Sequence, residues 1–467
     1  MLHTPIDLFL ERREAFYTLN RKHALLWYTS LVTGNFRETF LYNHLLGEKR
    51  SFRLRPLLGY LRYCIMELPF FSKYSPPEAH LLVATVFTQG KCKKISEVFF
   101  GNLLSRLERE NCKVIVIGKV THQFRQSIED NARKELGSNV YCPSHLLTKW
   151  DGLKCLLSAI YSFLKYRYPK EYRVQLFKDM AQSHMSEVLS ALLYQSMIKK
   201  ISFQNPQLRI LHPFEGNTWE SACSLSGQYD VGFQHSSVLN DQIKITSFPG
   251  RPLPSKVITT GREATEQLVR DWGYNPDVLI DGYTLRQAKI FDVQPKIAAP
   301  SKVRRVLVLM QGNEHQNGVL DILREFISKN SGVSVFLRPH PAVPYEGMGL
   351  REDEMSKVSN NPDLYSDILN HDACIYVSST AALESTYLGV PVVHIVLGKD
   401  VDGDPLFHMP YLKRVAKTSD DIAIILKELE KYPLFDEELV LARDYFDRYF
   451  KRPDEFMEEQ FKEWLCL

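Results

Sequence analysis

The stretch Val333-Ser334-Val335-Phe336-Leu337-Arg338-Pro339-His340-Pro341 decides the fold class of this 467-residue chain. Its first five residues form a short apolar run typical of a buried strand, and the two prolines stiffen its exit. Each proline disfavours the helical region for the residue before it, so Arg338 and His340 are both expected to be extended. A histidine fixed at the carboxyl end of a strand is well placed to meet a ligand in the crevice of an open α/β sheet.

A second predicted strand leads into a row of hydroxyl groups. The apolar run 373–377 precedes Ser378-Ser379-Thr380, and residues 381–388 then have helical periodicity, with Gly389 placed to end that helix. Hydroxyls and free backbone N–H groups at a helix start bind phosphate, although such hydroxyls also serve as plain caps. With His340 on a neighbouring strand, the pattern predicts a phosphate held between the two strand ends.

Strands and helices alternate over most of the chain. One alternation begins near residue 81, and a second begins at 305–310, after a stretch that is poor in periodicity. Alternation of this kind implies parallel sheets with helices on both faces, as in Rossmann-like domains. We therefore predict a two-lobed α/β protein with domains at residues 1–291 and 303–435. The cleft between the two domains is the expected place for a ligand.

Helical segments flank the two predicted domains. Residues 1–76 are rich in aromatic and basic side chains and are predicted to be a helical extension of the N-terminal domain. Residues 436–467 have a charged, amphipathic pattern typical of a C-terminal helical tail. Within the first domain, residues 95–110 are predicted to form a single helix after the first strand.

The composition is ordinary for a soluble globular protein, with 44% hydrophobic and 24% charged residues. The net charge of +3 gives no case for a nucleic-acid partner. Eight cysteines without any C-x-x-C spacing argue against a zinc site or a disulfide framework and fit a reducing cytoplasm. The start of the chain has no signal-peptide pattern, and no apolar run approaches the ~18–20 residues that span a bilayer. We expect a cytoplasmic protein whose surface could still contact the inner membrane.

A dense group of reactive side chains follows the predicted strand 208–211. Glu215 stands beside Gly216, where a substrate hydroxyl could approach it, and Glu220 comes five residues later. A carboxylate in this position can act as a general base, but either glutamate could instead cap a turn or the next helix. His235 ends the following strand and could hydrogen-bond either the fold or a substrate.

The order of these motifs along the chain resembles bacterial surface-carbohydrate biosynthesis proteins of the GT-B glycosyltransferase type. The resemblance covers roughly residues 205 to 395. Its second half is similar to the His-Pro and Ser-Ser/Thr signatures of bacterial sialyltransferases and polysialyltransferases. It is less similar to the CDP-glycerol glycerophosphotransferases of teichoic acid synthesis. The implied fold is GT-B, with the acceptor on the N-terminal domain and the nucleotide-sugar on the C-terminal domain.

The resemblance also implies roles for individual residues. Glu215 takes the position of the family's base, with Phe214 where the family motif has its first acidic residue; Glu220 is the second candidate and His235 the third. The phosphate of a CMP-activated sugar would be held by His340, Ser378, Ser379 and Thr380. The nucleotide would be contacted by Gly312, Arg338 and Glu384.

The implied activity is transfer of a sugar, such as a sialic acid or Kdo-like sugar, from a CMP-sugar to a surface polysaccharide or glycolipid precursor. No cofactor or metal is implied beyond the donor substrate. Asp400-Val401-Asp402-Gly403-Asp404 resembles the start of a calcium loop, but Tyr411 occupies its twelfth position, so an acidic turn is expected. Thr260-Gly261 and the turn 282–286 match family turns near the cleft and receive no chemical role.

Three other functions share these motifs. A transferase of polyol phosphate from a CDP donor would use the same phosphate clamp. A non-catalytic GT-B protein would bind glycan or nucleotide and scaffold a biosynthetic complex. A sugar-nucleotide epimerase would share the two-lobed fold. The turnover of a labelled donor separates these functions.

Overall fold

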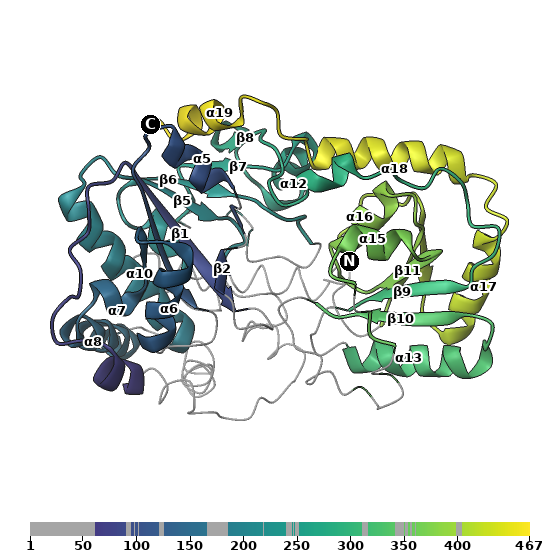
Figure 1. Cartoon of the computed structure of the whole chain (residues 1–467), viewed down its shortest axis with the longest axis horizontal. Coiled ribbons are helices and arrows are strands. Elements are labelled where there is room, and N and C mark those ends of the chain that lie inside the picture. The colour runs from purple at the N-terminus through teal and green to yellow at the C-terminus, as the bar shows by residue number, and fades with distance from the viewer. Residues whose placement is uncertain are drawn as a thin grey trace.

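The chain folds into two α/β domains that lie side by side, each built on one sheet (Figure 1). The structure, a computed structural model, describes residues 61–89, 95–97, 99–100, 102–120, 126–165, 185–217, 219–239, 252–310, 316–340, 357–359, 361–397 and 404–467, together with Ile245, Ser247, Leu350 and Glu354. Among these residues, the helices are all too short or too polar to cross a membrane. The two separate sheets confirm the predicted pair of Rossmann-like domains.

The N-terminal domain contains an eight-stranded sheet in the order β4-β3-β1-β5-β6-β7-β8, with β2 paired antiparallel to β1 and all other pairs parallel. Its strands are β1 (Leu81–Gln89), β2 (Ile95–Glu97), β3 (Val114–Val120), β4 (Val140–Tyr141), β5 (Arg209–Pro213), β6 (Tyr229–Phe233), β7 (Lys256–Ile258) and β8 (Leu279–Ile280). The chain moves outward from β1 to β4 and then returns to place β5 on the other side of β1. A ligand crevice is expected at such a reversal, beside the carboxyl ends of the strands.

The C-terminal domain repeats this plan with five parallel strands in the order β10-β9-β11-β12-β13. They are β9 (Arg305–Leu309), β10 (Ser334–Arg338), β11 (Ala373–Tyr376), β12 (Val392–Ile395) and β13 (Lys413–Ala416). The order reverses between β9 and β11, so β10 and β11 lie on either side of β9. The strands before His340 and Ser378 thus end at the same edge of the sheet, as the sequence predicts.

Helices cover the faces of both sheets because each parallel strand needs a crossover to the next. In the N-terminal domain they are α5 (Leu103–Arg109), α6 (Gln126–Leu136), α7 (Pro143–Leu146), α8 (Lys149–Lys165), α10 (Met185–Gln204), α11 (Glu220–Ser224) and α12 (Arg262–Trp272). In the C-terminal domain they are α13 (Gln316–Lys329), α15 (Leu364–Leu369), α16 (Ala381–Tyr387) and α17 (Ser419–Leu429). Gly389 ends α16 with a φ of 72°, a conformation that favours glycine, as predicted.

The prediction of one helix over residues 95–110 is wrong. Residues 95–97 pair with the end of β1 as an antiparallel strand, and the helix begins only at Leu103. The side chain of Glu97 accepts hydrogen bonds from the backbone N–H groups of Phe99 and Phe100, both at 2.9 Å. This local side-chain-to-backbone bonding competes with a helical continuation and turns the chain after β2.

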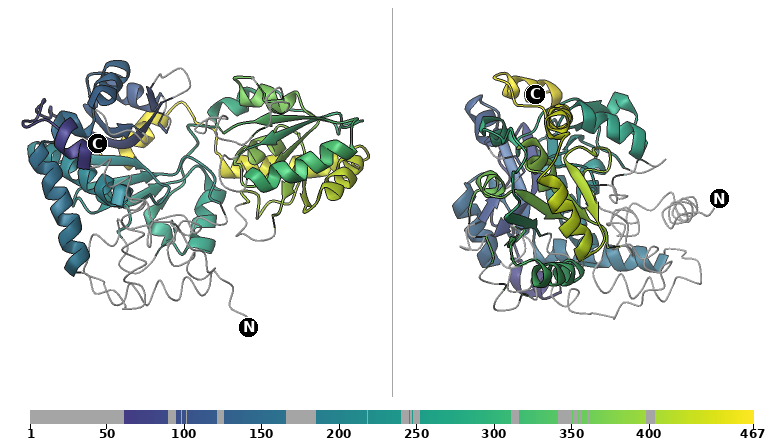
Figure 2. Two further views of the ribbon diagram at one scale, coloured as in Figure 1. Left: turned by 90° about the horizontal axis from the view of Figure 1, so that it is seen from below. Right: turned by 90° about the vertical axis from the view of Figure 1, so that its right-hand side faces the viewer.

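The last two helices join the domains. Helix α18 (Phe435–Tyr449) packs with the C-terminal core, where Phe446 and Tyr449 are fully buried. After a short connection, α19 (Met457–Trp464) crosses back and packs Met457 and Phe461 into the N-terminal core. Figures 1 and 2 show this tail, in yellow, bridging the two domains. It is thus a structural part of both cores.

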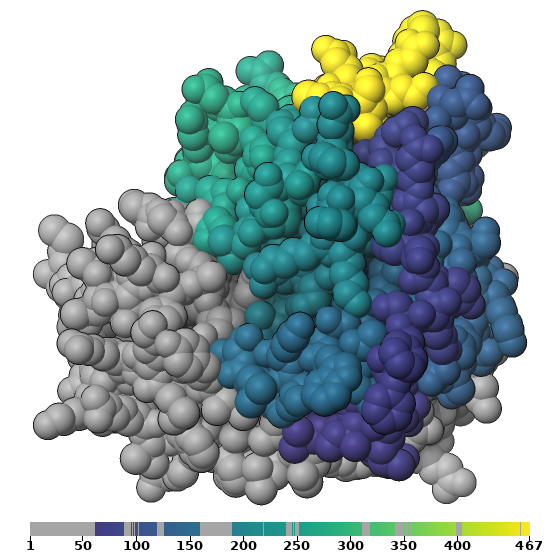
Figure 3. All heavy atoms as spheres, turned by 90° about the vertical axis from the view of Figure 1, so that its left-hand side faces the viewer, coloured from purple at the N-terminus to yellow at the C-terminus, as the bar shows by residue number. Residues whose placement is uncertain are grey.

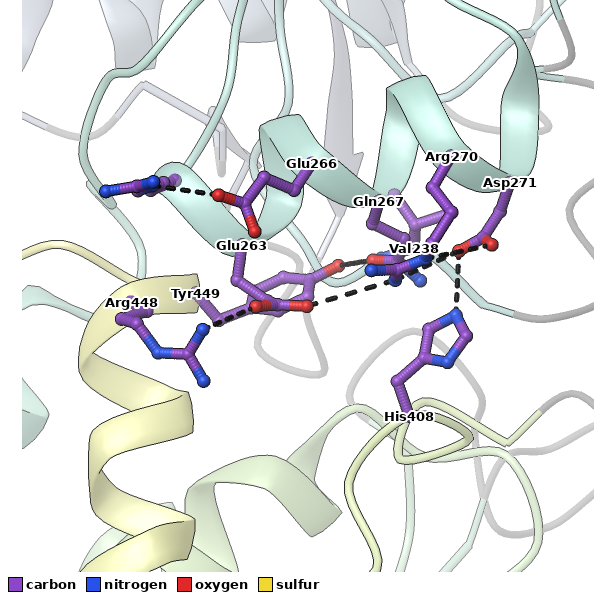
Figure 4. A network of polar contacts seen from close by, with 10 residues as sticks. Val238, Glu263, Glu266, Gln267, Arg270, Asp271, His408, Arg448 and Tyr449 are labelled. Atoms are coloured by element: carbon purple, nitrogen blue, oxygen red, sulfur yellow. Dashed lines mark hydrogen bonds and ion pairs between the residues drawn. The ribbon is translucent and has the colours of Figure 1, made fainter.

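A polar network fixes the junction between α12 of the N-terminal domain and the C-terminal domain (Figure 4). The hydroxyl of Tyr449 donates to Oε1 of Gln267 at 2.7 Å and accepts the backbone N–H of Val238 at 2.8 Å. Arg448 pairs with Glu263 at 2.9 Å on the same face. These contacts hold the end of α18 against α12.

The junction also requires a very close approach of the two backbones. A Cβ atom on Gly261, the residue before α12, would lie 2.5 Å from the carbonyl oxygen of Arg448 and 2.8 Å from that of Tyr449. Beside this contact, the N–H of Lys451 donates to the carbonyl of Thr260 at 2.9 Å. On a loop that reaches α12 from the C-terminal domain, His408 pairs with Asp271 at 2.7 Å. The turn Thr260-Gly261 therefore packs directly against the C-terminal end of α18.

We expect Tyr449→Phe to lower the free energy of unfolding by about 1–3 kcal/mol. The change leaves the buried N–H of Val238 without its acceptor and Oε1 of Gln267 without its donor, and stranding buried polar groups costs about this much. Tyr445→Phe, one turn earlier on α18, is the control, because Tyr445 is buried but makes no described hydrogen bond across this junction. Urea unfolding measures both, and equal midpoints would show that the Tyr449 hydroxyl does not secure the junction.

Candidate functional site

A cavity of about 530 Å³ lies between the domains, at the edge where the strands of both sheets end. The N-terminal domain contributes one wall, and the C-terminal domain contributes the other. The residues that line it on the N-terminal side include Glu215, Ser236, Ser237, Leu239 and Arg286; on the C-terminal side they include Met310, Arg338, His340, Ser359, Asn361, Ser378, Ser379, Thr380 and Glu384. The structure thus brings together most of the residues that the sequence singled out.

A second hollow, of about 750 Å³, lies on the C-terminal domain along the end of α17 and the turn 427–433. It contains no strand end and none of the predicted site residues. Crevices beside the carboxyl ends of parallel strands are where ligands of α/β sheets bind. The cavity between the domains is therefore the candidate active site.

Glu215 follows β5 and faces the cavity with its side chain about 29% exposed. Its Oε1 lies 3.0 Å from Nε2 of His235, which follows the neighbouring strand β6. Its Oε2 accepts a hydrogen bond from the side chain of Asn217 at 3.1 Å. The carboxylate is thus oriented from two sides while it stays open to the cleft, the arrangement that a general base needs.

Glu220 has a different task. It is 4% exposed and stands in the first turn of α11. Its Oε2 accepts the backbone N–H groups of Glu215 at 3.0 Å and of Gly216 at 2.8 Å, and its Oε1 accepts the side chain of Asn217 at 2.8 Å. All three bonds go to the turn that carries Glu215. The sequence left both glutamates open as bases, and the geometry places only Glu215 at the cavity wall.

His235 is a positioning residue in this arrangement. Its side chain is 3% exposed, and its ring packs edge-to-face against Phe99. Within the described part of the chain, Nδ1 is buried and has no hydrogen-bond partner. We infer that the ring proton resides on Nε2, where it can be donated to Glu215, since a proton on Nδ1 would be stranded. The ring therefore supports Glu215 and is not positioned to act on a substrate itself.

Glu220→Gln and Glu215→Gln should separate the two roles. Glu220→Gln should lower the free energy of unfolding by about 1–3 kcal/mol, because the amide nitrogen would face donors in place of an acceptor. Glu215→Gln should change stability by less than about 1 kcal/mol, since its pair with His235 is partly exposed. Chemical denaturation measures both variants. Equal stability losses would mean that Glu220 is not what holds the turn.

The C-terminal wall carries His340 and the hydroxyl row. Desolvation, together with the positive charge of Arg286, lowers the pKa of His340, which is therefore neutral at pH 7. It can serve there as a hydrogen-bond donor and not as a cation. Thr380 occupies the N-cap position of α16, but its side chain makes no capping hydrogen bond. The plain-cap interpretation of these hydroxyls therefore has no support at Thr380.

Arg338 is committed to the fold of this wall. Its Nη1 donates to Oδ2 of Asp367 at 2.5 Å and to the carbonyl of Asn361 at 3.0 Å. The hydroxyl of Ser359 donates to the same Asp367 oxygen at 2.8 Å. These bonds tie the end of β10 to the 359–367 segment that lines the cavity. The predicted nucleotide contact of Arg338 would have to come from its remaining N–H groups.

Sequence reasoning missed the contribution of Arg286. This residue follows β8, lines the cavity and is exposed there. Among the described residues it makes no ion pair, yet its charge influences His340, Tyr365 and Glu384 on the opposite wall. Gly282 allows the turn that delivers it, because a Cβ there would lie 2.5 Å from the carbonyl oxygen of Thr259. The family resemblance placed the turn 282–286 near the cleft, but it assigned Arg286 no chemical role.

Glu384 is a buried acid at the back of the cavity. It lies in the first turn of α16 and is 6% exposed. Burial raises its pKa to about 7, against the opposing charges of Arg286 and Arg338. A carboxyl group in this state can accept or donate hydrogen bonds near neutral pH. That versatility suits contact with ligand hydroxyls.

Glu384→Gln should stabilise the ligand-free protein at pH 7 and above. A carboxyl group with a folded-state pKa near 7 binds more protons when folded than unfolded between about pH 4.5 and 7. Its contribution to stability is therefore present below about pH 4.5 and is lost as the pH rises through 7. Thermal unfolding across pH 4.5–8 should show a smaller decline for the variant than for the wild type. Parallel profiles would contradict a raised pKa.

Gly312 and the acidic turn at residues 400–404 were also singled out from the sequence. Gly312 lies outside the described residues, as do Asp400 and Asp402 of the acidic turn. Asp404, the last acid of that turn, is buried and is bonded by Lys413, by the hydroxyl of Tyr376 and by the backbone N–H of Leu406. Asp404 thus connects the end of β11 with the first residue of β13. The described residues contain no group of three or more His, Cys, Asp or Glu side chains arranged to hold a metal ion.

Comparison with known proteins gives matches only among solved structures. No protein-family model and no curated protein matches the chain. A kitacinnamycin glycotransferase has 11% identity and a TM-score of 0.47, covering 84% of this chain and 100% of that one. SnogD, a glycosyltransferase from Streptomyces nogalater, has 13% identity and a TM-score of 0.44, covering 83% and 100%. A UDP-GlcNAc 2-epimerase from Neisseria meningitidis bound to UDP-GlcNAc has 12% identity and a TM-score of 0.45, covering 82% and 99%.

The fold class follows from the chain's own topology. Two Rossmann-like domains face each other across a cleft at their strand ends, and a C-terminal helical tail crosses back to the first domain. This is the GT-B arrangement.

Proposed function

We propose that the protein is a glycosyltransferase that uses a nucleotide-sugar donor. The observation that carries the proposal is one cavity in which an oriented carboxylate, Glu215, faces a wall of hydroxyl groups and an imidazole. Sugar transfer needs a base for the acceptor hydroxyl and a site that stabilises the departing phosphate. The N-terminal wall supplies the base, and the C-terminal wall together with Arg286 supplies the site for the phosphate.

The proposed reaction is a direct displacement. Glu215 takes the proton from the acceptor hydroxyl as its oxygen bonds to the anomeric carbon of the donor sugar. The bond from that carbon to the phosphate oxygen breaks, and the nucleotide leaves with the bonding electrons. Arg286 and the neutral His340 would stabilise the charge that develops on the departing phosphate, with the hydroxyls of Ser379 and Thr380 as further donors. The proposal requires no metal ion for this step.

We further propose a CMP-sugar as the donor and a surface polysaccharide or glycolipid precursor as the acceptor. The sequence resemblance supports this choice, and so does the charge of the cavity. Among its described residues, Arg338 is neutralised by Asp367 and His340 is uncharged at pH 7, which leaves Arg286 as the uncommitted cation. One cation matches the single negative charge of a CMP-sugar phosphodiester better than the two charges of a diphosphate donor.

Labelled donors test this function directly. The purified full chain would first be screened by thermal shift against CMP, CDP, UDP and GDP, because a ligand at a hundredfold excess over its Kd stabilises by about 2.7 kcal/mol. CMP-sialic acid and CMP-Kdo, labelled in the sugar, would then be incubated with a panel of acceptor glycans. We expect CMP to give the largest shift and sugar label to appear on an acceptor.

Each competing function has its own outcome. Transfer of phosphorus label from CDP-glycerol would indicate a polyol-phosphate transferase. Conversion of a nucleotide-sugar without an acceptor would indicate an epimerase. Nucleotide binding without turnover of any donor would indicate a non-catalytic protein. Any of these results in place of sugar transfer would overturn the proposal.

Arg286→Gln should reduce donor turnover by roughly 10²–10³, the usual cost of removing one donor that stabilises transition-state charge. His340→Ala should also reduce turnover at pH 7, because it removes the hydrogen bond that the neutral imidazole of the wild type donates. Arg262→Gln is the matched control, since Arg262 is exposed and pairs with Glu266 outside the cavity. Steady-state kinetics measure all three. A folded Arg286→Gln enzyme with wild-type turnover would remove Arg286 from the mechanism.

A further inference from the structure

Exposed apolar side chains gather at one edge of the N-terminal domain. Eight of the eighteen large hydrophobic side chains that are exposed in the described part of the chain belong to two short segments, 65–74 and 150–157. The more exposed among them are Phe71 at 86%, Met66 at 68%, Ile65 at 64%, Trp150 at 63%, Phe70 at 62% and Leu157 at 55%. Clusters of this kind on a soluble surface mark interaction sites.

The two segments lie against each other. The N–H of Lys149 donates to the carbonyl of Pro69 at 2.8 Å, and the Lys149 ammonium lies 4.2 Å from the centre of the Phe70 ring. A Cβ on Gly152 of α8 would lie 2.8 Å from the side chain of Leu68, so no side chain separates the helix from this segment. Figures 1 and 3 show the purple segment that begins at residue 61 beside α8, at the edge of the N-terminal domain away from the C-terminal domain.

The exposed face of α8 has a regular pattern. Trp150, Leu153 and Leu157 recur at intervals of three and four residues and so lie on one stripe of the helix. Lys149 flanks this stripe on one side and Lys154 on the other. We name this surface, formed by Phe70, Phe71, Trp150, Leu153 and Leu157 with the two flanking lysines, the α8 patch.

The charges of the α8 patch are predominantly positive. Lys154 is exposed and makes no ion pair among the described residues. Asp151, the acid on α8, is neutralised by Lys200 of α10 at 2.7 Å.

We propose that the α8 patch docks the protein on an anionic membrane surface. Aromatic side chains that are flanked by lysines suit the boundary between headgroups and acyl chains, where rings enter the interface and ammonium groups meet lipid phosphates. A second copy of the chain is the less suitable occupant, because a symmetric contact would bring the flanking lysines of both copies together. This inference does not depend on the reaction in the cleft.

Vesicle sedimentation with the full chain tests the proposal. The vesicles would contain either phosphatidylcholine alone or an equimolar mixture of phosphatidylcholine and phosphatidylglycerol. We expect binding to the mixed vesicles to be at least about tenfold tighter, and to weaken with added salt. Phe71→Gln with Trp150→Gln should lower the partition coefficient by about tenfold or more, and so should Lys149→Gln with Lys154→Gln.

Phe456→Gln is the matched control, since Phe456 is an aromatic residue with 55% exposure directly before α19. Helix α19 lies at the opposite edge of the domain from α8 in Figure 1. The Phe456→Gln variant should bind vesicles as the wild type does, and circular dichroism would verify that each variant is folded. Unchanged binding of the folded Phe71/Trp150 variant would overturn the proposal, as would a wild type that ignores both kinds of vesicle. A dimer in solution that the same two substitutions convert to a monomer would also overturn it, by assigning the surface to self-association.

Discussion

The contact between the end of α18 and the start of α12 is the constraint on which the rest of the structure depends. Tyr449 satisfies two buried polar groups of the N-terminal domain from a helix that belongs to the C-terminal core. Gly261 lets the carbonyls of that helix approach to a distance that no side chain would permit. Because each domain supplies one wall of the cavity, the placement of the two walls relative to each other is set at this junction.

The two walls divide the chemistry. The N-terminal wall places one carboxylate in the cleft and uses a second, Glu220, to hold the turn beneath it. The opposite wall supplies hydroxyls, a neutral imidazole and the buried Glu384. Arg286 belongs to the first wall, but its charge acts on the second.

The sequence predicted those parts of the structure that are encoded locally. Apolar runs and proline positions gave the strands and their exits, and parallel pairing then placed His340 and Ser378 at one edge without further information. The turn at Glu97 was not predicted, because its carboxylate bonds the backbone a few residues on and interrupts a helical pattern. The roles of Glu215 and Glu220 could not be distinguished, since they differ only in which way the side chains point after folding.

Arg286 shows why the candidate site could be predicted only in part. No local pattern separates an arginine that pairs at the surface, such as Arg262, from one that lines a cleft and makes no ion pair with the residues that the structure describes. The distinction depends on the turn at Gly282 and on the opposite domain. The same is true of Glu384, whose place in a short helix is visible in the sequence but whose burial against two arginines is not. Buried charges that lack full compensation oppose folding, and proteins tend to retain them where a ligand completes the set. Glu384 is a buried group of this kind, and Arg286, which is exposed in the cavity, supplies one of the two opposing charges.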